Sequence, residues 1–160
     1  MDASSFNLIV GLVLGFLFTM IPRAIDRRRN LFGYWKVLRE EINYCHDGAL
    51  SVHSAGVLSP LGRLPTTIYD EVLKHIVAEG DIEPAEARNL MRYYDLVKQV
   101  NHSLDIIHAA LTAKDMPRAL TEYGRTQLKT NLFAVGVKES CYDSAIELAN
   151  RHCNNRWWKF

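Results

Sequence analysis

The side chains best suited to bind an anion lie near the C-terminal end of the chain. Arg118, Arg125 and Lys129 are separated by seven and four residues, so on a helix their cationic groups project from one side. Such a stripe can contact phosphate groups. Glu122 lies among them, so the alternative is an ordinary solvated face in which charges pair along the helix. A second, looser set consists of Arg88, Arg92 and His102.

Two polar side chains, Asn101 and His108, interrupt an apolar stripe in the preceding segment. The stripe repeats every three or four residues, as a helix requires. One interpretation is that both side chains are buried and hydrogen-bonded inside a helical bundle. The other is that they face a pocket or a subunit interface. The apolar members of the stripe are Ala87, Leu90, Tyr94, Val97, Leu104 and Leu111.

Metal and catalytic chemistry have weak support in the sequence. Cys45-His46 and His152-Cys153 contain the residue types of a zinc site, but neighbours on a helix point about 100° apart, so one pair cannot easily supply two ligands. The chain lacks C-x-x-C, G-x-S-x-G, P-loop, G-x-G-x-x-G and H-E-x-x-H motifs. The adjacent acids Glu40 and Glu41 are typical of a solvated helix face. We therefore expect no enzyme, no metal and no cofactor.

A membrane-spanning helix is predicted over roughly residues 6–25. Sixteen residues without a charge, FNLIVGLVLGFLFTMI, begin at Phe6. As a helix they cover ~24 Å, and extension past Arg23, with its side chain reaching to the headgroups, spans the ~30 Å hydrocarbon core. The alternative is a cleaved signal peptide, which would have positive charge before the apolar run, whereas Asp2 precedes this one.

The charge distribution predicts the orientation of this helix. Residues 23–39 hold six cations and one acid, a net charge of +5, whereas residues 40–160 have a net charge of −3. Lys and Arg beside a membrane helix stay in the cytoplasm, so the N-terminus faces outward and the C-terminal domain is cytoplasmic. Three cysteines without framework spacing fit reduced thiols there. The mildly acidic domain argues against binding to long nucleic acids.

Association of the membrane helix is suggested by Gly11 and Gly15. They form a small-x-x-x-small pair that lets two helices approach closely in lipid. Pro22 lies near the cytoplasmic boundary, where it removes one backbone hydrogen bond and favours a kink. The sequence thus predicts a membrane segment that meets other copies of itself.

After an anchor and basic segment at 1–30, residues 31–160 predict one small all-α cytosolic domain. No strand pattern competes. Boundary residues and apolar spacing predict helices at about 31–53, 67–79, 84–113, 116–134 and 138–152, with a loop at 56–65 and a break at 135–137. The expected buried stripe of the first is Leu31, Trp35, Leu38, Ile42, Cys45 and Ala49. The second has an apolar face of Ile68, Val72, Leu73, Ile76 and Val77 that stops at Gly80, and Gly124 weakens the fourth.

The layout of the whole chain resembles one family, the small membrane-anchored accessory effectors of type III CRISPR systems. The resemblance rests on the anchor FNLIVGLVLGFLFTMIPR, joined directly to a helical domain of 130 residues that ends in RWWKF. It implies a homo-oligomer, such as a tetramer, in the bacterial inner membrane. The cytosolic domain of the family binds cyclic tetra-adenylate, and binding perturbs the bilayer and halts phage growth.

If such a ligand binds here, its adenines need amides, aromatic rings and neutral imidazole, and its phosphates need cations. The candidate contacts are Asn101 and His102 for base or ribose, and Arg118, Arg125 and Lys129 for phosphate. The C-terminal residues 156–160 mix cations and aromatic rings, which can stack on bases, dock on the bilayer or close the bundle. The alternative function is an inner-membrane scaffold that recruits a protein partner.

Overall fold

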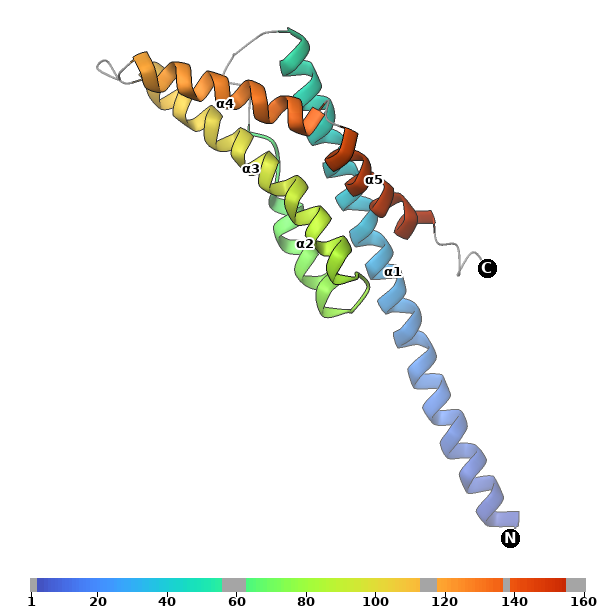
Figure 1. Ribbon diagram of the computed structural model, residues 1–160. Coiled ribbons are helices and arrows are strands. Elements are labelled where there is room, and N and C mark those ends of the chain that lie inside the picture. Colours follow the sequence, from blue (N-terminus) through green and yellow to red (C-terminus); the bar gives the residue numbers. More distant parts are fainter. Residues whose placement is uncertain (1–2, 56–62, 113–117, 137–138, 155–160) are drawn as a thin grey trace.

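The computed structural model describes residues 3–55, 63–112, 118–136 and 139–154, which form helices and, within these ranges, no strand. The helices are α1 (Ala3–Ala55), α2 (Thr67–Ala78), α3 (Pro84–Thr112), α4 (Arg118–Gly136) and α5 (Glu139–Asn154). Figure 1 shows that the N-terminal half of α1 extends away from a bundle that the other helices form around its C-terminal half. This confirms the predicted all-α fold, an apolar N-terminal helix followed by a helical bundle.

Helix α1 is unusually long, with 53 residues, or about 80 Å at 1.5 Å per residue. It is long and apolar enough to cross a membrane, and its most apolar stretch is not buried against other described residues. The helix runs through Pro22 and through the expected boundary between residues 30 and 31 without interruption. The apolar segment and the first helix of the bundle are therefore one element.

The C-terminal half of α1 forms the centre of the core. It packs against α2, α4 and α5, while α3 packs against α4 and α5. The predicted stripe is confirmed, because each of its six residues is at most 9% exposed. Trp35, the largest side chain of the stripe, is 1% exposed. The stripe consists of Leu31, Trp35, Leu38, Ile42, Cys45 and Ala49.

The end of α2 follows the predicted pattern. Gly80 has a φ of 68°, a left-handed conformation that favours glycine. The Gly80 N–H donates to Val77 O at 3.0 Å and the Asp81 N–H donates to Ile76 O at 3.2 Å, so the last carbonyls of the helix are satisfied. The predicted apolar face was partly wrong. Tyr69, Val72 and Ile76 are buried, whereas Val77 is 51% exposed because it lies about 100° around the helix from Ile76.

Helices α3 and α4 approach each other closely at Gly124. A Cβ atom at this position would lie 3.1 Å from Ile106 Cγ2 and 3.3 Å from Ile107 Cγ1. The glycine was expected to weaken the helix, but α4 continues through it. The absent side chain leaves room for Ile106 and Ile107 of α3. The predicted start of α4 falls in residues 113–117, outside the described part. The predicted break at 135–137 was placed too early, because α4 continues to Gly136 and α5 begins at Glu139, and residue 137 lies outside the described part.

Candidate functional site

Asn101 holds the segment before α2 against α3. Its Oδ1 accepts a hydrogen bond from the Leu64 N–H and its Nδ2 donates to Leu64 O, both at 2.8 Å. The side-chain amide thus satisfies both backbone groups of one buried residue. Of the two interpretations of this polar position, hydrogen bonding inside the bundle is correct for Asn101, although the residue is only partly buried. For His108 the buried interpretation is wrong, because this side chain is exposed.

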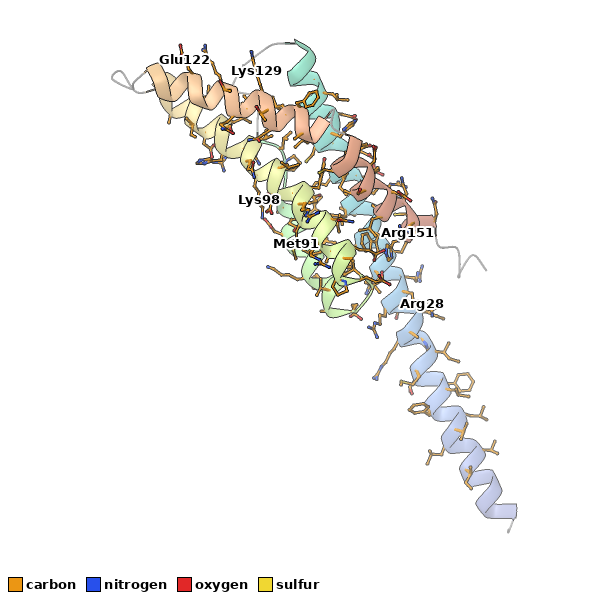
Figure 2. All side chains as sticks on the ribbon, in the orientation of Figure 1. Arg28, Met91, Lys98, Glu122, Lys129 and Arg151 are labelled. Carbon is orange, nitrogen blue, oxygen red and sulfur yellow. The ribbon has the colours of Figure 1, made fainter. Side chains whose placement is uncertain are left out.

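The other predicted contacts lie on the surface of α3 and α4. His102, Arg125 and Lys129 are exposed. Arg118 is the first residue of α4, and its side chain falls outside the described part. Figure 2 shows the side chain of Lys129 projecting from the outer side of α4, away from α3 in this view. The fold therefore leaves three of the five residues facing solvent and commits Asn101 to a structural contact.

A neighbouring face of α4 is buried. Leu128, Leu132 and Val135 are at most 3% exposed and belong to the same core as the α1 stripe. Asn131, also on α4, is 7% exposed. Because α4 packs on both α3 and α1, one rigid element carries cations on its outer side and contacts α1 on its inner side.

A cleft that the sequence did not predict lies between α1 and the segment leading into α2. Its volume is about 620 Å³. Tyr44, which is 65% exposed, and Val37 give it an apolar wall, while Arg63 at its edge pairs with Asp105 at 2.7 Å. The signal available in the sequence was the seven-residue spacing of Val37 and Tyr44, apolar residues that share a face outside the buried stripe. The lining is Lys36, Val37, Glu40, Glu41, Tyr44, Arg63, Pro65 and Ile68.

Glu41 is the charged residue whose environment differs most from the prediction. It is 3% exposed, and its two carboxylate oxygens accept hydrogen bonds from the N–H groups of Ile68 and Tyr69, both at 3.1 Å. The expectation of a solvated face was wrong for this residue because it caps the N-terminus of α2, where unpaired N–H groups and the helix dipole favour a negative charge. Thr66 occupies the N-cap position but makes no capping hydrogen bond through its side chain.

Buried tyrosines surround this carboxylate. The Tyr69 and Tyr94 rings stack with centroids 3.8 Å apart, and the Tyr93 hydroxyl donates to Ile42 O at 3.1 Å. Burial raises the pKa of Tyr94, and the negative charge of Glu41 raises it further. Burial likewise raises the pKa of Tyr69 to about 12. These phenols stay protonated, so the cluster serves packing and hydrogen bonding.

The two pairs considered as zinc ligands, Cys45-His46 and His152-Cys153, make other contacts in the structure. Burial raises the pKa of Cys45 to about 12, and its thiol donates a hydrogen bond to Pro65 O at 3.3 Å, so it is not a reactive thiolate. His46 stacks on Tyr142 with centroids 3.7 Å apart. His152 stacks on Trp35, with Asp81 Oδ2 3.4 Å from its Nδ1. Within the described ranges, no group of three or more His, Cys, Asp or Glu residues is arranged to hold a metal ion.

Comparisons with known proteins found no relative of this chain. No protein-family model matches the chain, and neither the curated proteins nor the solved structures contain a match. The C-terminal residues 156–160, which the sequence offered as a further contact surface, lie outside the described part. The site is therefore argued from the geometry of this chain alone.

Proposed function

We propose that this protein is a membrane-anchored receptor and effector in antiphage defence in the bacterial inner membrane. Its cytosolic domain binds a cyclic oligoadenylate second messenger, and binding perturbs the bilayer through an oligomeric transmembrane helix. The observation that carries this proposal is the continuity of α1. The same helix supplies the exposed apolar segment and, through Trp35 and Ile42, the centre of the domain core. A change in the domain packing therefore acts directly on the membrane segment.

The proposed ligand surface is the outer side of α3 and α4. His102 contacts a base or ribose, and Arg125 and Lys129, with Arg118, contact phosphates. A cyclic ligand with several phosphates needs few cations from each subunit when subunits converge on it, so the acidic balance of the domain is compatible with binding. Because α4 also packs on α1, a ligand that favours one position of α4 shifts α1 with it.

The homo-oligomer is supported by the free face of the apolar segment. Gly11 and Gly15 are exposed, and a Cβ atom added at either one would meet nothing within 4 Å. A neighbouring helix can approach the backbone along this face. The basic residues that follow, Arg23 and the run Arg27 to Arg29, support a cytoplasmic domain and an outward N-terminus.

A scaffold that recruits a protein partner is the second candidate, and the cleft beside α1 favours it. Val37, Tyr44, Pro65 and Ile68 offer apolar contacts with Lys36 and Arg63 at the rim. Protein interfaces combine an apolar, aromatic centre with a polar rim in this way. In this function α1 only brings the cleft to the membrane surface, and no small ligand is needed.

Calorimetry with the full chain in lipid nanodiscs separates the two functions. We expect cyclic tetra-adenylate to bind and the double variant Arg125→Gln/Lys129→Gln to weaken binding. The control Lys36→Gln/Lys74→Gln makes the same change of charge on exposed residues of α1 and α2, away from the proposed ligand surface, and should bind as the parent does. Failure of cyclic and linear oligoadenylates to bind more tightly than about 1 mM, or ~4 kcal/mol, would contradict the receptor proposal.

A further inference from the structure

A second cavity lies where α1 leaves the apolar segment and first contacts the bundle. Its volume is about 490 Å³, within the range of roughly 300–1,000 Å³ that is typical of small-ligand pockets. One wall is a single face of α1, and the other is the turn between α2 and α3. The lining is Met20, Arg23, Ala24, Arg27, Arg28, Leu31, Glu79 and Asp81.

The two acids of this cavity already have partners. The Arg27 side chain forms an ion pair with the Glu79 carboxylate and also donates to Glu79 O at 2.9 Å. Asp81 Oδ2 accepts the hydrogen bond of Trp35 Nε1 at 2.7 Å. Arg23 and Arg28 are exposed, and no acid in the described ranges pairs with either. The cavity therefore presents two guanidinium groups whose charge is not neutralised by the protein.

The position of the cavity along α1 suggests the kind of anion it takes. Met20 and Ile21 are among the last exposed large apolar side chains of the segment, and Arg23 is the first charge after the uncharged run that begins at Phe6. If α1 crosses a bilayer as proposed above, Arg23 and Arg28 lie at the level of the lipid phosphates. Guanidinium groups bind phosphate with two parallel hydrogen bonds. Met20 and Ala24 continue the cavity toward the acyl chains.

We infer that this cavity binds an anionic phospholipid, with Arg23 and Arg28 on the headgroup phosphate and Met20 and Ala24 beside the acyl chain. The inference rests on the proposed membrane insertion of α1 and is independent of the oligonucleotide. A lipid seated there touches both α1 and the turn that carries Glu79. It therefore fixes the position of the bundle over the membrane surface.

The test compares neighbouring arginines in the full chain. The protein is assembled in nanodiscs of equimolar phosphatidylcholine and phosphatidylglycerol, and the lipids that stay bound on release are identified by native mass spectrometry. We expect enrichment of phosphatidylglycerol, and Arg28→Gln should reduce it about tenfold, because the headgroup phosphate loses charge-assisted hydrogen bonds that only a residue lining the cavity can make. Arg29→Gln is the matched control because Arg29 is exposed in the same basic run but does not line the cavity.

Equal losses in Arg28→Gln and Arg29→Gln would overturn the inference, since a general attraction of the basic run to the membrane gives that result. Absence of phosphatidylglycerol enrichment in the parent would overturn it as well. Flotation with pure phosphatidylcholine vesicles tests insertion separately. A chain that floats without lipid preference contradicts the lipid site alone, whereas a chain that does not float contradicts the proposed anchor and the lipid site together.

Discussion

The indole N–H of Trp35 donates a hydrogen bond of 2.7 Å to Asp81, 46 residues further along the chain. The indole is 1% exposed and also stacks on His152, with ring centroids 4.1 Å apart and planes 8° apart. Three elements therefore meet at one side chain of α1: the turn after α2, the end of α5 and α1 itself. This contact fastens the helix to the bundle just beyond the basic segment.

Replacement of Trp35 by phenylalanine should loosen this fastening. The aromatic ring remains, but Asp81 loses its hydrogen bond, and bonds to charged groups contribute about 1.5–3 kcal/mol. Because Asp81 keeps contact with water, we expect a loss of about 1.5 kcal/mol, near the lower limit. Thermal unfolding of the full chain in detergent micelles measures it. Tyr44→Phe, at an aromatic residue that is 65% exposed, is the control and should leave the unfolding temperature unchanged.

Glu41 and Glu40 provide a test of helix capping with identical chemistry at adjacent positions. Glu41→Gln removes the charge of the carboxylate that accepts hydrogen bonds from two N–H groups of α2. Loss of a helix cap costs about 0.5–2 kcal/mol. Glu40→Gln removes a charge that is 60% exposed and pairs with Arg39. We expect the first variant to unfold at a lower temperature and the second to match the parent. Equal unfolding temperatures for the two variants would contradict the capping role.

Asn101→Ala should destabilise the domain more than His102→Ala does. The alanine leaves the N–H and C=O of Leu64 without the partner they have now, and each unsatisfied buried group costs about 1–3 kcal/mol. His102 is exposed, so its removal should change stability little. Hydrogen exchange at the Leu64 amide gives a local readout beside the unfolding temperature. If the Leu64 amide stays protected in Asn101→Ala, the hydrogen bonds of the Asn101 side chain are not needed to hold this segment.

Stability should fall at alkaline pH because of Cys45. Its pKa is raised from 9.0 to about 12 in the folded chain by burial, so the unfolded state ionises first as the pH rises. The stabilisation from the protonated thiol is therefore complete below pH 9 and lost between pH 9 and about 12. At about pH 10.5 the loss is on the order of 2 kcal/mol.

Urea unfolding of the parent and of Cys45→Ala at about pH 8 and about pH 10.5 measures this effect. The difference between the two pH values should be smaller in the variant. Tyr69, whose pKa is also about 12, contributes in the same range and should keep part of the slope in both proteins. An unchanged slope in Cys45→Ala would contradict the assignment.

The continuity of α1 can be tested by insertion after Asn30. Seven glycine and serine residues break the connection between the apolar segment and the bundle, while seven alanine-rich residues extend the helix by about two turns with a rotation of only ~20°. We expect the flexible insert to abolish the effect of cyclic tetra-adenylate on vesicle permeability without changing its binding. The helical insert should retain more of the effect. Full activity with the flexible insert would make α1 a passive tether.

The sequence predicted the elements well and their mutual contacts poorly. The spacing of Leu31 to Ala49 and the helix-ending Gly80 are local signals, and the helices formed where these signals indicated. Glu41 and Asn101 were misjudged or left open because their partners lie 27 and 37 residues away and become neighbours only after the helices pack. The cleft beside α1 was missed for the same reason, since Arg63 and Pro65 come from a different segment.

The uninterrupted 53-residue helix α1 also limits which insertions, deletions and anchor exchanges the protein can tolerate. Where a flexible linker joins an anchor to a domain, the connection tolerates any helical phase and a range of lengths. Here each residue inserted or deleted between Arg23 and Leu31 turns the membrane face by about 100° relative to the core face. Exchange of the anchor for that of another protein would therefore preserve function only when the graft keeps the helical phase.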